Sequence, residues 1–179
     1  MARSFDEVFA TEFDSLQAYL HRRVGASAAE DLTAETFATA YRRWNELEPA
    51  RRVRPWLYGI ATNLLRHHWR KQRRMWRAYS RTGVDLVELD DEGAVERLDA
   101  RAQARALAQS LVGLRPAERE VLLLHAWAQL TDEEIAEALS LPVGTVKSRL
   151  SRARNHLRNH FFTTGQSEVG KPTTPKEIR

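Results

Sequence analysis

The side chains best suited to molecular recognition lie along residues 143–158. Apolar residues recur there at spacings of three and four, which predicts an amphipathic helix with these positions toward a core: Val143, Val146, Leu150, Ala153 and Leu157. The opposite face carries hydrogen-bonding or cationic side chains and no acid: Thr145, Lys147, Ser148, Arg149, Ser151, Arg152 and Asn155. Such side chains donate hydrogen bonds to base edges and phosphates, so this face favours binding of DNA.

The segment directly before this helix supports the same interpretation. Thr131 and Glu134 have the spacing of a capping box, which predicts that a short helix begins there. Leu141 and Pro142 predict a turn, and Pro142 suits the first position of the next helix. A short acidic helix, a tight turn and a basic helix form a helix-turn-helix, whose second helix enters the major groove. The alternative is an ordinary helical hairpin with a basic surface, which the cap, spacing and charge segregation together disfavour.

A second cationic face is predicted on residues 55–77. Polar residues recur there at spacings of three and four and form one stripe, opposite the apolar residues: Asn63, Arg66, Arg70, Arg73 and Arg77. Tryptophans are interleaved with the stripe. Cations that hold phosphates beside aromatic rings suit single-stranded or melted nucleic acid, whose bases can leave the stack. For Trp44 and Trp56, packing in a core is the favoured interpretation, whereas for Trp69 and Trp76 both interpretations stay open.

These two faces must be positioned by helices. The spacing of apolar residues predicts helices along most of the chain. The expected helices are residues 5–24, 28–44, 55–77 and 95–112, one from Pro116, and the pair on either side of 139–142. The side chains expected to face inward in the first three are Phe5, Phe9, Phe13, Leu16, Leu20 and Val24, then Leu32, Phe37, Ala40, Tyr41 and Trp44, then Leu57, Ile60, Ala61, Leu64 and His68. Residues 48–54 are expected to be a loop. No segment alternates convincingly between apolar and polar residues, so no sheet is expected.

Charge and composition divide the chain into domains. Segment 80–96 holds two glycines, an acidic run and no strong period, which predicts a linker between two basic-leaning parts. The polar tail 163–179 is expected to be disordered. The predicted fold is all-α: two small helical bundles, joined by an acidic flexible linker, with the helix-turn-helix in the second. The expected boundaries are 1–77, 78–97 for the linker, 98–162, and 163–179.

Composition excludes several other classes. The chain has 179 residues, 28 Lys and Arg against 24 Asp and Glu, and no cysteine, so it has no disulfide, thiolate metal site or cysteine nucleophile. No apolar run reaches the roughly 20 residues of a membrane-spanning helix, and the N-terminus lacks a secretion signal. His156 and His160 have a spacing that could hold zinc, but no third ligand is evident. We therefore expect a cytoplasmic protein with no membrane insertion, no metal or cofactor and no enzymatic activity.

Four stretches together resemble a known family. They are AEDLTAETFATAYRRW (29–44), RPWLYGIATNLLRHHWRKQRR (54–74), LRPAEREVLLL (114–124) and LTDEEIAEALSLPVGTVKSRLSRAR (130–154). In this order and spacing they resemble bacterial RNA polymerase sigma factors of the extracytoplasmic-function (ECF) type, in the sigma-70 family, which contain the second and fourth conserved sigma regions. The resemblance covers nearly all of residues 5–160. A helix-turn-helix alone would be less specific, because many regulators carry one.

The resemblance implies an alternative sigma factor that binds core RNA polymerase and directs promoter recognition and transcription initiation. Contacts to the polymerase β′ clamp would come from Asp31, Glu35, Phe37 and Trp44. Contacts to the minus-ten element would come from Arg52, Arg54, Asn63, Arg66, Arg70 and Arg73. Contacts to the upstream, minus-thirty-five element would come from Thr145, Lys147, Ser148, Arg149, Ser151 and Arg152. Further implied partners are the polymerase β flap and an anti-sigma factor, and the acidic linker would pass through the RNA channel of the polymerase.

Gly59 departs from the family pattern, in which arginine is common at this position. Glycine in the middle of a helix costs roughly 1 kcal/mol relative to alanine, and no cation is present there to contact the DNA backbone. Two alternatives to a sigma factor stay open. One is a one-component helix-turn-helix regulator that acts without polymerase and carries a ligand pocket or a dimer helix. The other is an interaction protein whose helices bind another protein.

Overall fold

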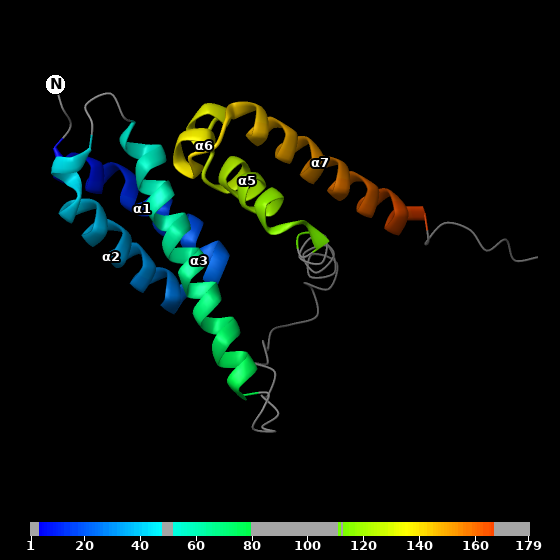
Figure 1. Cartoon of the computed structure of the whole chain (residues 1–179), viewed down its shortest axis with the longest axis horizontal. Helices are drawn as coiled ribbons and strands as arrows, with labels where there is room; N and C mark the ends of the chain where they lie inside the picture. The colour runs from blue at the N-terminus through cyan, green and yellow to red at the C-terminus, as the bar shows by residue number, and fades with distance from the viewer. Residues whose placement is uncertain (1–3, 48–51, 80–110, 112, 167–179) are drawn as a thin grey trace, which may run out of the picture. The chain divides into compact units, whose positions relative to one another are not determined.

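The computed structural model describes residues 4–47, 52–79, 111 and 113–166. Its elements are helices (Figure 1): α1 (Phe5–Val24), α2 (Ala26–Arg42), a 3₁₀ turn η1 (Trp44–Glu46), α3 (Val53–Tyr79), α5 (Pro116–Trp127), α6 (Asp132–Leu139) and α7 (Val143–Gln166). No strand occurs within these residues, which confirms the all-α prediction. Residues 78 and 79 of the predicted linker 78–97 form the end of α3, and the rest of the linker lies outside the described residues. The helix predicted at 95–112 also lies outside them, except for residue 111. None of the described helices is both long and apolar enough to cross a bilayer.

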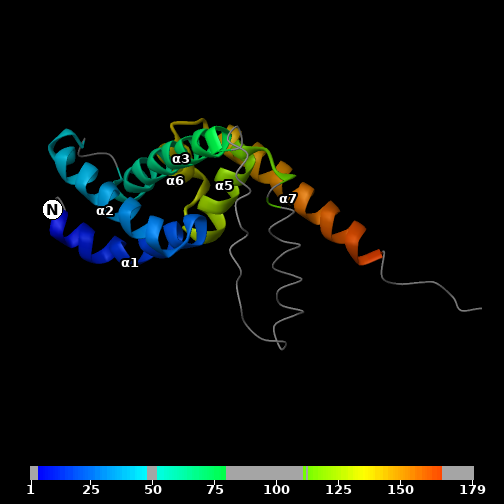
Figure 2. The ribbon, with the colours of Figure 1, turned by 90° about the horizontal axis from the view of Figure 1, so that it is seen from below.

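The chain divides into two compact units. One comprises Met1–Gly93 with Leu123–Lys147, and the other comprises Ala94–Leu122 with Ser148–Arg179. In the first unit α1 and α2 lie side by side, and α3 packs against both (Figure 1 and Figure 2). Helix α6 belongs to the same unit and packs on α3. The helix that carries the predicted minus-ten stripe therefore has neighbours both early and late in the sequence.

Helix α1 begins at a capping box. Ser4 Oγ accepts a hydrogen bond from the Glu7 N–H at 3.2 Å, and the Ser4 N–H donates to the Glu7 carboxylate at 3.1 Å. The helix ends at Gly25, whose φ of +79° suits glycine. Its buried residues are Val8, Glu12, Leu16, Tyr19 and Leu20. The prediction that Phe9 faces the core is wrong, because the buried face is centred on Val8 and leaves Phe9 42% exposed.

Helix α2 begins and ends two residues before its predicted bounds, and Trp44 opens η1. Tyr41 was predicted to face inward but is 68% exposed, because the helix buries the face that carries Thr33 and Thr36. Each of these threonine hydroxyls donates to the carbonyl oxygen four residues earlier, at 2.7 and 2.6 Å. A hydroxyl bonded within its own helix can be buried at little cost, so hydropathy alone does not reveal such core positions.

Helix α3 begins at Val53, two residues before the prediction, so Arg54 lies in the helix and not in a loop. Burial of Trp56, which is 5% exposed, confirms that this tryptophan packs in the core. Burial of Leu57, Ile60 and Ala61 is also as predicted. The next position differs: Leu65 is fully buried, whereas the predicted Leu64 is only half-buried. The core face therefore follows a slightly different line along the helix.

Helix α5 confirms the prediction of a helix from Pro116, and α7 extends further than expected. Residues 163–166, predicted to be disordered tail, form the last turn of α7. Pro142 precedes α7, and its carbonyl oxygen accepts the N–H groups three and four residues later, at 2.9 and 3.2 Å. It therefore caps the helix instead of occupying its first turn. Val146, Leu150 and Ala153 are buried as predicted, while Val143 and Leu157 are half-buried.

Candidate nucleic-acid interface

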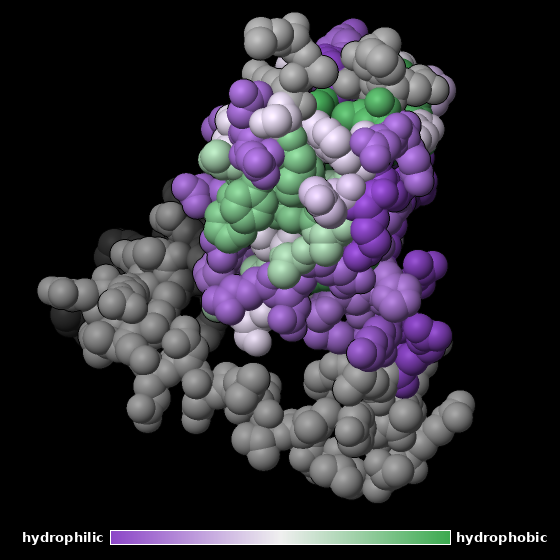
Figure 3. All heavy atoms as spheres, turned by 90° about the vertical axis from the view of Figure 1, so that its left-hand side faces the viewer, coloured by the Kyte–Doolittle hydropathy of each residue, from purple (hydrophilic) through white to green (hydrophobic). Residues whose placement is uncertain are grey.

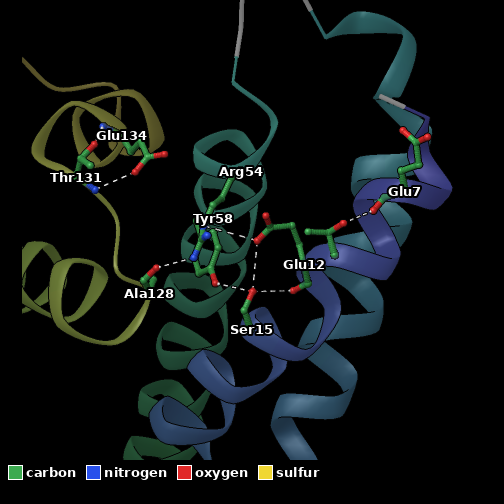
Figure 4. Close-up of polar contacts among 9 residues, drawn as sticks. Glu7, Glu12, Ser15, Arg54, Tyr58, Ala128, Thr131 and Glu134 are labelled. Carbon is green, nitrogen blue, oxygen red and sulfur yellow. Dashed lines mark hydrogen bonds and ion pairs between the residues drawn. The ribbon is translucent and has the colours of Figure 1, made fainter. Parts of the chain in front are cut away.

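Helix α6 begins at the predicted capping box. Thr131 Oγ1 accepts from the Glu134 N–H at 3.2 Å, and the Thr131 N–H donates to the Glu134 carboxylate at 2.9 Å (Figure 4). The helix ends at Ser140, which adopts a left-handed conformation with a φ of 53°, and the Leu141 N–H then donates to the Ala136 carbonyl at 2.8 Å. A single turn leads into α7. This succession of helix, turn and helix confirms the helix-turn-helix.

The polar face of α7 lies opposite its buried face. Lys147, Ser148, Ser151, Arg152 and Asn155 are exposed, and Thr145 and Arg149 are half-buried. Every residue predicted to contact the upstream element thus lies on one helix. The exposed side chains of this face can donate hydrogen bonds to DNA while α7 stays folded.

Arg152 is held by a residue that the sequence did not single out. Its Nε donates to Oε1 of Glu118 at 3.0 Å. The Glu118 side chain is only 10% exposed, whereas that of Arg152 is 57% exposed. A carboxylate near the start of α5 therefore anchors an arginine on the polar face of α7. No helical spacing relates the two residues, which are 34 positions apart, so periodicity could not reveal the pair.

Four of the five residues of the predicted stripe on α3 are exposed to solvent, and the side chain of the fifth, Arg77, lies outside the described part of the chain. Asn63, Arg66, Arg70 and Arg73 all lie on the surface, and Arg66 donates to the Asn63 side-chain oxygen at 3.4 Å. Further along, an open depression is lined by His67, Arg70, Arg73 and Arg74. Trp69 is 36% exposed beside this surface. The stripe is thus a strongly cationic strip with one partly exposed aromatic ring.

The first turn of α3 holds its cations differently. The guanidinium of Arg54 lies 3.6 Å from the carboxylate of Glu12, and its Nη2 donates to the Ala128 carbonyl at 2.9 Å (Figure 4). Glu12 is buried, and its carboxylate also accepts from Ser15 Oγ at 3.3 Å. Arg52 is exposed but pairs with Glu137 at 3.0 Å. Of the cations assigned to the minus-ten element, the two at the start of α3 therefore have carboxylate partners.

Tyr58 completes this network. Its hydroxyl lies 3.4 Å from Ser15 Oγ, and the Arg54 guanidinium lies 5.8 Å from the centre of its ring (Figure 4). Burial raises the pKa of Tyr58 above its ordinary value of 10.0, and the hydrogen bond to Ser15 and the charge of Arg54 only partly oppose that rise. Tyr58 is therefore a neutral hydrogen-bonding group at physiological pH.

The residues predicted to dock on polymerase divide into two layers. Asp31 and Glu35 are exposed on α2, whereas Phe37 is 4% exposed and Trp44 is half-buried. The exposed aromatic side chain of α2 is instead Tyr41, and Phe9 of α1 also reaches the surface. Ring contacts at 4.7–6.4 Å join these aromatics: Phe5–Phe37, Phe5–Tyr41, Phe5–Trp44 and Phe9–Phe37. Figure 3 shows an apolar patch, rimmed by hydrophilic residues, on one face of the molecule.

Among the described residues, no three His, Cys, Asp or Glu side chains come together as a group that could hold a metal ion. His156 is exposed at the surface of α7.

Comparison with known proteins gives the family. The family model described as Sigma-70 region 2 matches residues 9–75, and that described as Sigma-70, region 4 matches residues 104–157. The RNA polymerase sigma factor HrpL of Pseudomonas syringae pv. syringae is 31% identical, over 87% of this chain and 85% of its own. The RNA polymerase sigma-E factor of Streptomyces coelicolor is 32% identical, over 88% and 85%. The ECF RNA polymerase sigma factor SigW of Bacillus subtilis is 30% identical, over 88% and 89%.

The chain belongs to the sigma-70 family of RNA polymerase sigma factors. Its relatives include sigma factors of the ECF type, and the chain is likewise an alternative sigma factor. It binds core RNA polymerase and directs promoter recognition and transcription initiation.

Solved structures support the fold. CnrH in complex with the cytosolic domain of CnrY matches with a TM-score of 0.63 at 23% identity, over 89% of this chain and 88% of the other. The sigma factor RpoE of Bartonella quintana, in complex with the anti-sigma factor NepR, matches with a TM-score of 0.65 at 23% identity, over 88% and 96%.

Proposed function

We propose that this sigma factor holds promoter DNA with two surfaces, the polar face of α7 and the cationic stripe of α3. The observation that carries the proposal is the division of each helix into two faces. Each buries apolar residues on one side and presents cations to solvent on the other. Phosphate contacts from cations position a protein on DNA, and side-chain donors in the major groove select its sequence.

The polar face of α7 serves the upstream, minus-thirty-five element. Arginine pairs with guanine through two hydrogen bonds, and serine and threonine bond to several bases. The residues that we assign to this contact are Thr145, Lys147, Ser148, Arg149, Ser151 and Arg152. The capped turn before α7 supports this assignment, because it fixes the start of the helix.

The stripe of α3 serves the minus-ten element in its melted form. Asn63 contacts a base that has left the stack, while Arg66, Arg70 and Arg73 hold the strand backbone, with Arg52 and Arg54 at the start of the helix. Extruding a base costs a few kcal/mol, which phosphate contacts and a base contact can offset. The free energy of the Asn63 contact with an unstacked base therefore stabilises only the opened promoter. The sigma factor itself performs no covalent chemistry and is not an enzyme, since the polymerase makes the RNA.

The remaining assignments concern partners and domains. Residues 1–77 form the domain that docks on the polymerase β′ clamp, through Asp31 and Glu35 with Phe37 and Trp44 beneath them. Residues 98–162 form the second DNA-binding domain, which also contacts the β flap. The linker 78–97, whose first two residues are the end of α3, joins the two domains. The tail 163–179, whose first four residues are the end of α7, follows the second domain. CnrH and RpoE were each solved with a protein partner, which supports an anti-sigma factor for this chain. Because these partners include RNA polymerase, we expect the protein to act in the cytoplasm.

Run-off transcription with purified core polymerase over genomic fragments tests the proposal. The Lys147→Ala/Arg152→Ala variant should lose at least about tenfold in initiation at responsive promoters, because each base contact contributes about 1–3 kcal/mol. Arg158→Ala removes an exposed cation from the same helix, six positions beyond the last assigned residue, and should retain activity. No run-off product with any fragment would refute the proposal, and specific promoter binding without polymerase would favour the one-component regulator.

The Asn63→Ala variant tests the stripe of α3 independently of the polar face of α7. This variant should form closed promoter complexes normally but open them poorly, because its side chain contacts a base only after melting. Filter binding measures the closed complex, and permanganate reactivity of unpaired thymines measures opening. Equal loss in both measurements would mean that Asn63 does not act on the melted strand.

A further inference from the structure

Glu12 is a buried acid that neither DNA-binding surface uses. It lies on α1, and its side chain is only 8% exposed. Its carboxylate lies 3.6 Å from Arg54, in the first turn of α3. We propose that Glu12 is a positioning residue, which neutralises and orients Arg54 so that this arginine bonds to a base of the minus-ten strand and not to a phosphate. The inference rests on the proposed function, in which Arg54 belongs to the minus-ten contact.

The carboxylate of Glu12 is held by a chain of polar contacts. Burying a carboxylate is costly unless it is paired with a cation and accepts hydrogen bonds. Ser15 Oγ donates to Oε2 of Glu12 at 3.3 Å, and the same oxygen lies 3.6 Å from Nε of Arg54. The Tyr58 hydroxyl donates in turn to Ser15 Oγ at 3.4 Å (Figure 4). The position of the carboxylate is therefore fixed from both α1 and α3.

The guanidinium of Arg54 is held at one edge and on one face. Its buried Nε faces Glu12, and its Cζ lies 5.8 Å from the centre of the Tyr58 ring. Ordering a long side chain opposes binding, and here the order exists before any DNA binds. The Arg54 side chain is still 38% exposed. A ligand can therefore reach an arginine whose direction is already set.

The charge of Glu12 determines which ligand Arg54 prefers. A phosphate that approached Arg54 would also approach the negative charge of Glu12, so attraction and repulsion would oppose each other. An uncharged acceptor meets less repulsion. Arg54 Nη2 already donates to such an acceptor, the carbonyl oxygen of Ala128, at 2.9 Å. Bases present carbonyl oxygens of the same kind, and a guanidinium has five N–H donors, so one bond does not exhaust it.

The stripe further along α3 is built differently. An open depression there is lined by His67, Arg70, Arg73 and Arg74, with no acid among these residues. Within the described part of the chain, no carboxylate pairs with Arg70 or Arg73. These arginines keep their full charge and suit phosphates. The strand is thus held by phosphate contacts along the stripe and read by a base contact at Arg54.

The salt dependence of binding distinguishes the two kinds of contact. Each phosphate contact to a single strand contributes about −0.7 to the slope of log affinity against log salt, whereas a bond to a base does not. We expect Arg70→Ala to make the slope shallower by about 0.7. Arg54→Ala should weaken binding about tenfold and leave the slope unchanged. The probe is a fluorescein-labelled oligonucleotide, the non-template minus-ten strand of a promoter active in run-off transcription, and it is bound to holoenzyme.

Glu12→Gln removes the charge and keeps the size of the side chain. Arg54 is then no longer neutralised and can bind a phosphate, so the slope should become steeper by about 0.7. The double variant Glu12→Gln/Arg54→Ala should return to the slope of Arg54→Ala, because the added phosphate contact requires the arginine. A merely structural role of Glu12 would lower affinity without this arginine-dependent change of slope.

Abasic positions in the probe identify the base. An abasic position that lowers affinity in the parent but not in Arg54→Ala marks the base that Arg54 contacts. We expect one such position, with a loss of about tenfold in the parent. In Glu12→Gln the loss at this position should be about fivefold smaller. If every abasic position costs Arg54→Ala as much as it costs the parent, Arg54 does not contact a base.

Two further variants control for charge and for folding. Asp14→Asn removes an exposed acid of α1 close to Glu12 in sequence and should leave the slope unchanged. Ser15→Ala removes a hydroxyl from the same network but keeps the charge of Glu12. It should lower the midpoint of urea unfolding without making the slope steeper. If Glu12→Gln does not fold, comparison of Arg54→Ala with Arg70→Ala still distinguishes a base contact from a phosphate contact.

Two results would overturn the proposal in an active holoenzyme. One is a slope that becomes as shallow in Arg54→Ala as in Arg70→Ala, and the other is an unchanged slope in folded Glu12→Gln. Failure of the proposed function has a different signature, since the parent chain would then give no run-off product with any fragment. That result would refute this inference together with the proposed function, whereas the slopes refute the inference alone.

Discussion

Glu118 and Arg152 join two helices through one charged contact. Only the Nε atom of Arg152 is engaged, at 3.0 Å, so its two terminal nitrogens have no hydrogen bond within the described part of the chain. Those nitrogens are the donors that pair with guanine or phosphate. The nearly buried carboxylate thus orients the arginine without using its recognition atoms.

Replacing Glu118 with glutamine should therefore weaken sequence-specific binding. We expect Glu118→Gln to lose about 1 kcal/mol, roughly fivefold, in binding of holoenzyme to the upstream element, because a charge-assisted contact to the arginine is lost. Competition between the element and a scrambled duplex measures the effect, with Glu133→Gln as the control. If affinity rose equally for both duplexes, Glu118 would only neutralise Arg152, and the orienting role would be wrong.

Tyr58 makes the stability of the first unit depend on pH in the alkaline range. Its pKa is raised in the folded chain, so the folded state keeps the phenol proton after the unfolded state has lost it. The contribution is complete below the unfolded pKa near 10 and is lost as pH rises from there toward the folded pKa. Urea unfolding from pH 8 to 11 should show this decline in the parent chain and a shallower one in Tyr58→Phe. The exposed Tyr41→Phe should behave as the parent; equal slopes in all three would contradict the assignment.

At the scale of helices, the line of burial along α3 is testable at two adjacent leucines. Leu65 is fully buried, whereas Leu64 is half-buried. Leu65→Ala should cost about 2–5 kcal/mol in free energy of unfolding, as large-to-small changes in a core do, and Leu64→Ala should cost distinctly less. Urea denaturation followed by circular dichroism measures both. A larger loss at Leu64 would mean that the core follows the line that periodicity predicted.

Periodicity and caps revealed the helices, but not which residues turn fully inward. The capping box at Thr131 and the polar face of α7 could be predicted, because both are local and repeat within one helix. The errors at Phe9 and Tyr41 arose where aromatic rings contact one another at the surface, which hydropathy counts as core. The pairs Glu118–Arg152 and Glu137–Arg52 join residues 34 and 85 positions apart. No spacing rule encodes such pairs, since tertiary packing alone brings them together.

At the scale of the whole molecule, two modest surfaces must act together. Each surface offers a few cations, so one alone should bind DNA weakly and with strong dependence on salt. We expect the isolated chain to show little preference for a promoter over random DNA, and the holoenzyme to show a clear preference, because polymerase makes the second contact intramolecular. Fluorescence anisotropy with both forms at two salt concentrations measures this. Strong preference by the isolated chain would contradict it.

The packing of α6 on α3 brings the two backbones close together at Gly59, which constrains how this gene can change. Every amino-acid substitution at position 59 adds at least one carbon atom, and that atom would already lie 2.7 Å from the backbone oxygen of Ala138. Missense mutation at this codon therefore has no graded series of mild replacements.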